Sequence, residues 1–586
     1  MNRDVGKNHL QSTNQVDDNA NILQKNKHKN NAQQNRFNTL SNNKNNQKND
    51  NSLGGSSESN GDISHDSSSS KKTADLPPHN MDSNYINNTN NVNNHISNNR
   101  NFSNTNKDYN HNLPINKGRN NNFTNNKNRT NMQNNHIKSH NQSLSAEQKS
   151  KILLQINKFI KQEMDLVDFY NLSINVKLML ADICCIENKD NLIEKELHVE
   201  LLKSLISLNY IFTYEGFIEL LPEGYGFLHK QENSFTTVNT DVYVPNSLLR
   251  MFDIRKGDKL KVIVKAPMLA SKFLAANSIL QLNDKKPVKY ANRVCFKDFR
   301  AISPDKKFAF DNIINSQSCK VTSRIIDFIS PIGFGQRALI VAPPRVGKTS
   351  IIHVLIQYIS YFHKDVVTFA LLIGERPEEV THMEDNTDAI VISSTFDDPA
   401  AKQIQAAEMT IARAKRLVEM GKDVVIFVDS LTRLVRAYNI NAPNSNKIMS
   451  GGVDAAALLK AKELFGPARN IAQGGSLTII ATVLVDTGSK MDTVVFEEFK
   501  GTSNCDIVLD KKAAESRMFP SINIKASGTR NDDILHGKYL KQVNVLRKIL
   551  NTQENANALK FMISKLNMSD NNEQLFELLS NTNVKN

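Results

Sequence analysis

The residues Gly347-Lys348-Thr349 follow an apolar run, residues 338–341, and precede a segment with helix-like spacing. With the five residues before them they read Ala-Pro-Pro-Arg-Val-Gly-Lys-Thr, the pattern of a phosphate-binding loop except for alanine in place of the first glycine. In such a strand–loop–helix unit, backbone N–H groups and the helix N-terminus face the phosphates of a nucleotide. The predicted nucleotide-binding residues are Pro343, Pro344, Arg345, Val346, Gly347, Lys348, Thr349 and Ser350.

Two acidic residues stand at the ends of further predicted strands. Asp429 closes the apolar run 424–428, and Glu375 comes just after the run 366–373. Open parallel sheets bind ligands at the carboxyl ends of their strands, so both carboxylates are expected beside the phosphates. Lys348 is predicted to contact the β- and γ-phosphates, while Thr349 and Asp429 hold Mg²⁺. Glu375 is predicted to orient and deprotonate the attacking water. These residues predict ATP hydrolysis with Mg²⁺.

Other chemistries have little support in the sequence. His353, His363 and His382 lack metal-ligand spacing, and no Gly-x-Ser-x-Gly motif is present. The five cysteines are scattered without a Cys-x-x-Cys pair, which favours a reduced, cytoplasmic compartment over a disulfide framework. No apolar run approaches the roughly 20 residues that span a bilayer, and the first residues lack the apolar core of a signal peptide. We therefore expect a soluble, cytoplasmic protein without a membrane partner.

The chain divides into regions of different composition. Residues 1–148 are rich in asparagine and predict a disordered low-complexity tail, because they offer too little apolar surface to offset chain entropy. The tail is either a solvated segment with weak RNA affinity or a self-associating one. The net charge of +13 favours an anionic partner, nucleic acid above all, although a solvated basic surface would give the same charge.

The remaining residues predict a multidomain fold. Helical spacing over 149–210 predicts a small helical bundle, and short alternating runs broken by turns over 211–285 predict an OB-like β-barrel. Residues 286–318 are interpreted as a linker. From 319 to 586 strands alternate with helices, which predicts a mainly parallel sheet in a RecA-like α/β P-loop ATPase domain. The strands are expected at 338–341, 366–373, 389–393, 424–428 and 477–485.

The predicted barrel contains glycines beside aromatic residues. The run Gly224-Tyr225-Gly226-Phe227 places two rings where bases could stack, and Tyr243 and Phe273 are candidates for the same surface. Taken alone, each of these aromatic residues would more often belong to the core than to a binding surface. Barrels of this size often bind single-stranded nucleic acid, so the four rings are the predicted RNA-binding surface.

Taken together, several motifs resemble the Rho family of transcription termination factors, and the resemblance extends from about residue 150 to 583. The motifs are Pro-Ile-Gly-Phe-Gly-Gln-Arg (331–337), the phosphate loop (342–349), Gly-Glu-Arg-Pro-Glu-Glu-Val-Thr (374–381), Val-Asp-Ser-Leu-Thr-Arg-Leu-Val-Arg-Ala-Tyr-Asn (428–439) and Asp-Thr-Gly-Ser-Lys-Met-Asp (486–492). The resemblance implies a homohexameric, RNA-dependent ATPase and helicase that moves 5′ to 3′ along RNA and terminates transcription, with RNA polymerase and elongation factors as partners.

The resemblance also implies roles for individual residues. Glu375 corresponds to the catalytic base, and Arg530 to an arginine finger supplied by the neighbouring subunit, although by its type alone it could be a surface cation. Arg376 and Arg433 correspond to further interface arginines, and Phe519 to the aromatic that packs on adenine.

RNA contacts are implied at two further places. Lys447, in the loop 441–452, and Lys490, in the loop 486–490, correspond to residues of the central channel, although either loop could be an ordinary solvated one. The barrel aromatics correspond to a primary RNA site that prefers pyrimidines, C-rich RNA in particular.

The sequence departs from the family pattern at three positions. Gly374 stands where aspartate is common, Arg345 where lysine is frequent, and Lys272 where a second aromatic often precedes Phe273. None of these changes removes a catalytic group, but the third weakens the expectation of a pyrimidine preference.

Two other classes remain open. A rotary or export ATPase subunit would share the phosphate loop, Glu375 and Asp429, but would need neither exposed aromatics nor lysine-bearing channel loops. A non-motor RNA-binding regulator would not need the full catalytic set.

Overall fold

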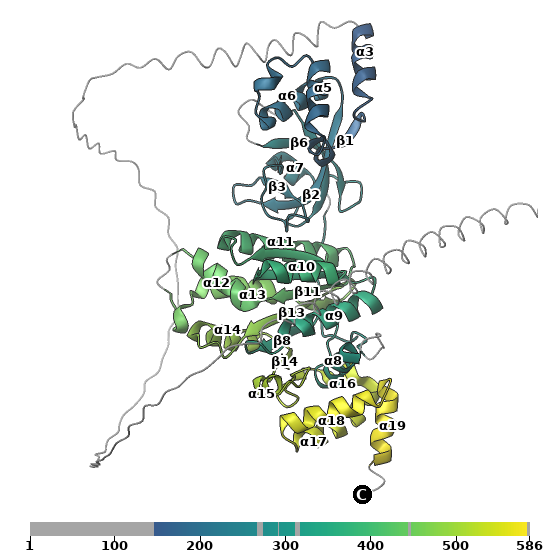
Figure 1. The fold of residues 1–586 in the computed structure, drawn as a ribbon, viewed down its shortest axis with the longest axis vertical. Helices are drawn as coiled ribbons and strands as arrows, with labels where there is room; N and C mark the ends of the chain where they lie inside the picture. Colours follow the sequence, from purple (N-terminus) through teal and green to yellow (C-terminus); the bar gives the residue numbers. More distant parts are fainter. Residues whose placement is uncertain (1–145, 267–272, 291, 311–316, 444–446, 583–586) are drawn as a thin grey trace, which may run out of the picture. The chain divides into compact units, whose positions relative to one another are not determined.

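The computed structural model describes residues 146–266, 273–290, 292–310, 317–443 and 447–582 (Figure 1). The predicted tail lies outside these residues except for 146–148, which already belong to the first described helix. Within the described part of the chain, no helix is both long enough and apolar enough to cross a membrane.

The segment predicted as a helical bundle contains helices and one short strand. The helices are α3 (Ala146–Ile156), α4 (Leu166–Tyr170), α5 (Ile174–Ile183) and α6 (Glu194–Ser207), with the 3₁₀ turn η1 (Lys189–Asn191). Between α3 and α4 the strand β1 (Glu163–Asp165), which helical spacing did not predict, pairs in parallel with the first strand of the barrel. This strand joins the helical segment to the barrel sheet.

The barrel is closed by pairing between strands that are distant in the sequence. Its strands are β2 (Ile211–Leu220), β3 (Gly226–His229), β4 (Val242–Val244), β5 (Lys259–Lys265) and β6 (Leu274–Leu282), with α7 (Asn246–Met251) after β4. The strands follow the order β2-β3-β4-β6-β5, and β5 pairs back with β2. Five strands that close in this way form an OB-like barrel.

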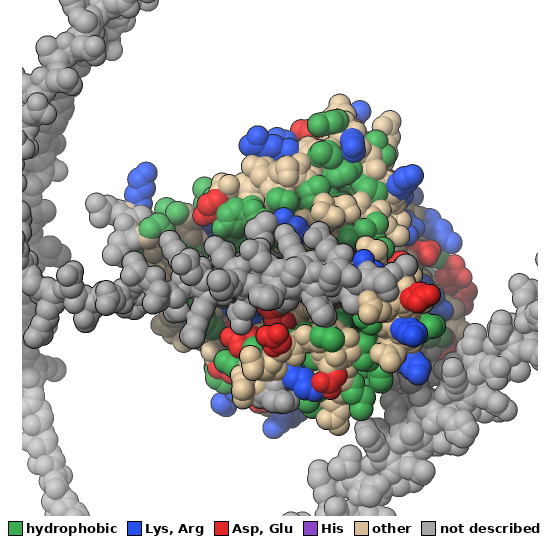
Figure 2. All heavy atoms as spheres, turned by 90° about the horizontal axis from the view of Figure 1, so that it is seen from above, with side chains coloured by type: hydrophobic (Ala, Val, Ile, Leu, Met, Phe, Trp, Pro, Cys, Tyr) green, Lys and Arg blue, Asp and Glu red, His purple; other side chains and the backbone are tan. Residues whose placement is uncertain are grey.

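The helices and the barrel share one hydrophobic core. Leu166 and Leu201 from the helices belong to the same buried cluster as Phe212 and Val262 from the barrel. Figure 2 views the face where α3, α5 and α6 lie at the top of Figure 1; hydrophobic side chains there are interspersed with lysines and arginines. The apolar surface of the helices is therefore mostly buried against the barrel rather than within a separate bundle.

A nine-stranded sheet forms the second half of the described chain. Its main path is β10 (Ile390–Thr395), β9 (Val367–Glu375), β11 (Val424–Asp429), β13 (Ser476–Leu484), β8 (Arg337–Ala342), β14 (Cys505–Val508) and β15 (Gly528–Thr529). All neighbours from β10 to β14 are parallel, and β15 is antiparallel. Off this path, β12 (Arg469–Ile471) pairs with β13 and with β7 (Ala301–Ile302). The five strands predicted from apolar runs correspond to β8, β9, β10, β11 and β13.

Helices cover both faces of this sheet (Figure 1). The helices of this half are α8 (Gln317–Ile329), α9 (Lys348–Phe362), α10 (Pro377–Asn386), α11 (Ala400–Glu419), α12 (Leu431–Asn441), α13 (Ala455–Phe465), α14 (Lys490–Lys500), α15 (Lys511–Glu515), α16 (Asp532–His536), α17 (Leu540–Asn551), α18 (Asn555–Asn567) and α19 (Asn572–Thr582), with the 3₁₀ turns η2 (Phe296–Asp298), η3 (Ser450–Gly452) and η4 (Gly537–Tyr539). Of these, α18 packs against α8, and α17 and α19 pack against α18. Side chains alternate between two cores, as Leu372 packs with α8 and α9 while Leu371 and Ile373 pack with α11 and α12.

The predicted linker, 286–318, contacts both halves of the chain: Arg293 bonds Asp258 of the barrel, whereas the described residues from Phe296 onward pack against the second half. Phe308 and Phe310 are fully buried beside α8 and α9, and β7 extends the large sheet. The segment has no clear helical or strand period and for that reason resembled a linker, but isolated aromatic anchors are enough to hold it.

The C-terminal helices are held by a buried cation. Arg324 of α8 is fully buried and donates hydrogen bonds to the carbonyl oxygens of Leu566 and Ser569 and to the side chain of Asn572. These bonds fix the ends of α18 and α19 against α8.

Candidate nucleotide and RNA-binding sites

The phosphate loop connects the end of β8 to the start of α9. Arg345 and Gly347 both have left-handed backbone conformations, with φ of +65° and +85°, and Gly347 immediately precedes the helix. The hydroxyl of Ser521 donates to the carbonyl oxygen of Val346 at 2.6 Å, which anchors the loop from the other side. The first N–H groups of α9 are thus presented to a phosphate group, as in other helix N-terminal anion sites.

Lys348 lies between the two predicted carboxylates. Its Nζ atom is 3.0 Å from Oε1 of Glu375 and 2.5 Å from Oδ1 of Asp429. Glu375 ends β9 and Asp429 ends β11, and both are almost completely buried. The structure therefore brings together the three residues that the sequence placed at one edge of the sheet.

A bulge at Gly374 sets the direction of Glu375. Ile373 pairs with Ser394 and Glu375 pairs with Thr395, so Gly374 is an extra residue in β9, with φ of +66°. An inserted residue breaks the regular alternation of a strand. Glu375 therefore does not share the face of the sheet that Leu371 and Ile373 occupy. Its side chain is directed toward Lys348 instead.

Arg433, at the start of α12, holds this bulge from within the same subunit. Its Nη1 atom donates a hydrogen bond to the carbonyl oxygen of Gly374 and lies 3.3 Å from Oε2 of Glu375. A Cβ atom at Gly374 would lie 3.2 Å from Cδ of Arg433. The absence of a side chain at Gly374 thus leaves room for the side chain of Arg433 to pack over the bulge.

The charges of the site shift two pKa values. Burial and the negative charge of Asp429 raise the pKa of Glu375 above its ordinary value, while Lys348 and Arg433 act in the opposite direction. Burial disfavours the charge on Lys348, but Asp429 and Glu375 outweigh it and raise the pKa of the ammonium. A carboxylate with a raised pKa is a stronger base than an ordinary one, which suits proton abstraction near neutral pH.

The donor set beside the loop fits a divalent cation bound with a triphosphate. Oδ1 of Asp429 accepts hydrogen bonds from Lys348 and, at 2.8 Å, from the hydroxyl of Thr482, while Oδ2 has no hydrogen-bond partner among the described residues. The hydroxyl of Thr349 has none among them either. A carboxylate oxygen and a hydroxyl oxygen are ligands of the kind that Mg²⁺ prefers.

Phe519 lies beside the phosphate loop. A Cβ atom at Gly347 would lie 3.5 Å from its ring, and about half of the Phe519 side chain is exposed. A half-exposed ring next to the loop offers a flat surface to the base of a bound nucleotide.

Two of the predicted catalytic arginines lie outside the cluster. Arg376 is exposed at the start of α10, and Arg530 is exposed just after β15, beyond the β14 edge of the sheet. Among the described contacts, neither side chain reaches Lys348, Glu375 or Asp429. Both guanidinium groups are free to meet another molecule.

The four predicted aromatics of the barrel form one cluster. Ring centroids are 5.9 Å apart for Tyr225 and Phe227, 5.4 Å for Tyr225 and Tyr243, 5.9 Å for Phe227 and Tyr243, and 4.8 Å for Phe227 and Phe273. All four are half-buried, whereas the alternate residue Leu228 points into the core. The rings therefore face outward from the barrel, as a stacking surface requires.

The neighbouring glycines are needed for different reasons. Gly226 has no space for a side chain, because a Cβ atom would lie 2.5 Å from the carbonyl oxygen of Glu219. Gly224 has φ of +88° in the turn that leads into β3. These glycines allow β2 and β3 to approach closely and carry Tyr225 and Phe227 side by side.

The two lysine-bearing loops lie next to each other. A Cβ atom at Gly451 would lie 2.8 Å from the carbonyl oxygen of Lys490, so η3 packs against the start of α14. Lys447 and Lys490 are both exposed. Residues 444–446 of the first predicted loop lie outside the described residues.

Helix α12 connects these loops to the phosphate site. Arg436 binds both carboxylate oxygens of the buried Asp492, at 2.8 and 2.7 Å, and Asp492 also accepts a hydrogen bond from Thr487. One turn further along, the Asn439 side chain accepts a bond from the backbone N–H of Asp454 at 2.7 Å. The same helix carries Arg433, so one helix contacts Glu375 and the residues just after both loops, Asp454 and Asp492.

Sequence reasoning missed these supporting residues. Thr482, Arg436 and Asp492 are ordinary residue types in predicted elements, and only their pairing gives them a role. The spacing of Arg433, Arg436 and Asn439 at three-residue intervals was the available signal, because such residues lie near one face of a helix.

Comparisons with known proteins agree with this arrangement. The model of the Rho termination factor RNA-binding domain matches residues 214–288, and that of the ATP synthase alpha/beta family nucleotide-binding domain matches 322–529. Transcription termination factor Rho of Haemophilus influenzae is 47% identical over 365 residues, 62% of this chain and 87% of that protein. The Rho proteins of Chromobacterium violaceum and Escherichia coli are 41% and 40% identical, each over 71% of this chain and 99% of their own length.

The fold and the site define a P-loop ATPase that carries an OB-like nucleic-acid-binding barrel. The chain belongs to the transcription termination factor Rho family, since relatives at 40–41% identity match over nearly their whole length.

Proposed function

We propose that this protein is an RNA-dependent ATPase and helicase that binds nascent single-stranded RNA and terminates transcription. The observation that carries the proposal is the position of α12, which contacts the catalytic Glu375 through Arg433 and the residues just after the two lysine-bearing loops through Arg436 and Asn439. A helix with these contacts can transmit the state of the nucleotide to RNA in the channel.

The chemistry follows from the geometry of the phosphate site. Lys348 offsets charge on the β- and γ-phosphates, and Glu375 accepts the proton of the water that attacks the γ-phosphorus as the bond to the β-phosphate oxygen breaks. Thr349 and Asp429 hold Mg²⁺, which when bound offsets charge on the phosphate oxygens. Phe519 packs on the adenine.

The exposed arginines support assembly into a ring. Arg530 and Arg376 carry charges that their own subunit leaves unused, and an arginine supplied in trans stabilises the charge of phosphoryl transfer. We infer a homohexamer in which Arg530 of one subunit completes the site of the next. Hydrolysis is then coupled to contacts between subunits.

RNA binds at two places in this scheme. The cluster of Tyr225, Phe227, Tyr243 and Phe273 stacks the bases of a C-rich or other pyrimidine-rich segment, since stacking on aromatic rings contributes about 1–3 kcal/mol per base. Lys447 and Lys490 contact the phosphate backbone in the channel. RNA polymerase and elongation factors are the partners that termination requires.

A rotary or export ATPase is the competing assignment. It accounts for the phosphate site but gives no role to four outward-facing aromatic rings on the barrel. The match to an RNA-binding domain over 214–288 also favours the RNA-dependent enzyme.

The test is ATP hydrolysis with and without poly(C). We expect strong stimulation, and we expect the Lys447→Ala/Lys490→Ala variant to lose it while retaining oligo(C) binding at the barrel. Lys195→Ala, which removes an exposed charge on α6, is the matched control and should behave as the parent protein. Hydrolysis that is indifferent to RNA would exclude the proposal in favour of a rotary-type ATPase.

A further inference from the structure

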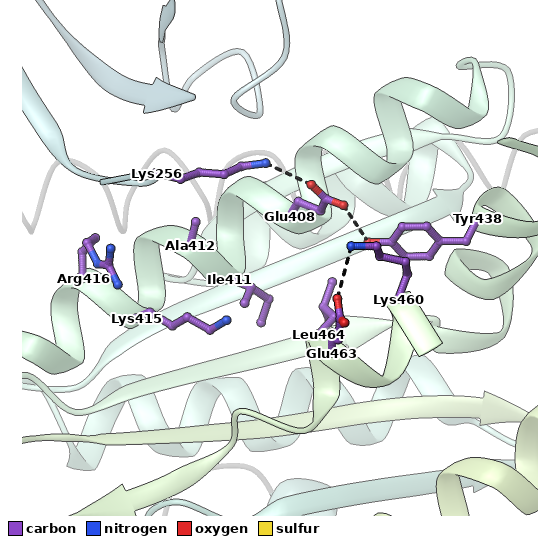
Figure 3. A pocket seen from close by; sticks show the side chains of 10 residues that line it. All are labelled: Lys256, Glu408, Ile411, Ala412, Lys415, Arg416, Tyr438, Lys460, Glu463 and Leu464. Atoms are coloured by element: carbon purple, nitrogen blue, oxygen red, sulfur yellow. Dashed lines mark hydrogen bonds and ion pairs between the residues drawn. The ribbon is translucent and has the colours of Figure 1, made fainter. Parts of the chain in front are cut away.

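A pocket of about 320 Å³ lies apart from both sites, between α11, α12, α13 and the loop that precedes β5 (Figure 3). Its floor is apolar, formed by Ile411 and Leu464, and Tyr438 closes one side. The volume is at the lower end of the range of about 300–1,000 Å³ typical of small-molecule sites.

The walls of the pocket carry more positive than negative charge. Lys256, Lys415, Arg416 and Lys460 line it, against the two acids Glu408 and Glu463. Both acids already have partners within the pocket. Lys256 lies 2.9 Å from Glu408, which also accepts a hydrogen bond from Tyr438, and Lys460 lies 3.3 Å from Glu463.

Two adjacent cations of α11 lack sufficient partners. Lys415 has no hydrogen bond or ion pair with any described residue, and Nε of Arg416 is buried without an acceptor although its Nη2 atom bonds Glu419 at 2.6 Å. Burial and the positive charges of Arg416 and Arg469 lower the pKa of Lys415. Arg416 is thus paired with Glu419, whereas Lys415 has no acid in direct contact among the described residues, although buried cations are normally paired.

Two of the lysines point toward the same space. Figure 3 shows Lys415 and Lys460 extending from opposite sides toward the gap between α11 and α13. Several cations around one small cavity suit a group that carries more than one negative charge and several acceptor oxygens, which describes a phosphate better than a carboxylate.

We propose that this pocket binds a small phosphorylated molecule. Its phosphate group contacts Lys415 and Lys460, and its remaining part lies on Ile411 and Leu464. Tyr438 belongs to α12. A ligand in the pocket therefore contacts the helix that connects Glu375 to the two lysine-bearing loops.

The experiment is calorimetric titration of the full chain with inorganic pyrophosphate. The Lys348→Ala background removes the phosphate-loop lysine, so that binding at the ATP site does not contribute. We expect one class of site per chain. Adding Lys415→Gln should weaken binding at least tenfold, because it removes a direct contact.

Lys462→Gln is the matched control, since it removes a charge from the same helix as Lys460 but from a side chain that pairs with Glu498. It should leave the affinity unchanged. Thermal denaturation should show Lys415→Gln to be at least as stable as its parent, because it removes an unpaired cation. Lys460→Gln, at an exposed position, provides an independent test with little risk to folding.

Three results would overturn the proposal. Pyrophosphate binding that is lost in Lys348→Ala alone would place the ligand at the ATP site. Binding that is unaffected by Lys415→Gln would place it elsewhere on the surface. Displacement of pyrophosphate by oligocytidine would show that the pocket takes the backbone of RNA instead. Each readout is a binding constant, so failure here leaves the RNA-dependent ATPase assignment untouched.

Discussion

Replacing Arg433 with glutamine tests how the bulge in β9 positions Glu375, the proposed catalytic base. The guanidinium donates to the carbonyl oxygen of Gly374 and pairs with Glu375 at 3.3 Å. A hydrogen bond to a charged group contributes about 1.5–3 kcal/mol. If that free energy holds Glu375 in the reactive geometry, its loss corresponds to a decrease in kcat of about 10- to 150-fold.

The assay separates positioning from binding. Steady-state ATP hydrolysis at saturating poly(C) should show the decrease in kcat with little change in KM for ATP, because Lys348 and the phosphate loop are intact. Oligo(C) binding to the barrel should equal that of the parent. Arg433→Lys should recover only part of the activity, since a single ammonium cannot reproduce the planar guanidinium contact with both groups.

The pH profile provides a second readout. Arg433 lowers the pKa of Glu375 against the effects of burial and of Asp429. Removing the arginine therefore raises that pKa further, and the acidic limb of the kcat profile should move to higher pH, because the base must be deprotonated to act. A kcat within twofold of the parent, with an unmoved acidic limb, would refute the role of Arg433 in positioning Glu375.

Three further predictions concern the ring, the barrel surface and the barrel core. Arg530→Ala should abolish turnover and spare oligo(C) binding, and near-normal hydrolysis would contradict a trans arginine. Phe227→Ala should weaken oligo(C) binding by about 1–3 kcal/mol, roughly five- to 150-fold, in a filter-binding assay. Although burial opposes the charge on His229, its hydrogen bonds to Asp241 and Glu219 raise its pKa to about 9. The shift from about 6.5 contributes about 3 kcal/mol of stability that is fully present below pH 6.5 and lost as the pH rises through 9. Hydrogen exchange of β3 should report this loss, and His229→Gln should remove the pH dependence.

Much of the phosphate site was predictable because its parts are local. The phosphate loop is a contiguous stretch, and its chemistry follows from the backbone conformation of eight residues and one helix N-terminus. Glu375 and Asp429 were recognisable because each ends an apolar strand, and parallel strands bring their carboxyl ends to one edge. The structure places Lys348 within 3.0 Å of both acids.

The domain organisation was less predictable, because a hydrophobic core that two segments share cannot be recognised in the sequence of either segment alone. Helical spacing over 149–210 gave no sign of β1, whose only support is its pairing with β2. The segment 286–318 resembled a linker, since Phe308 and Phe310 reveal their burial only where α8 and α9 meet them. Closure of the barrel likewise depends on the pairing of β5 with β2, strands that lie far apart in the sequence.

The sequence alone determined the chemical groups of this protein: a phosphate loop, two strand-end carboxylates, four barrel aromatics and two loop lysines. Only the tertiary structure decided that Gly374 forms a bulge that turns Glu375, that Arg433 contacts this bulge, and that Lys415 faces a pocket without an ion pair to any described residue. The physical reason is that residue type and spacing specify what a side chain can do and which face it occupies. Strand register and helix packing specify what it meets, and these depend on contacts between segments that are distant in the chain.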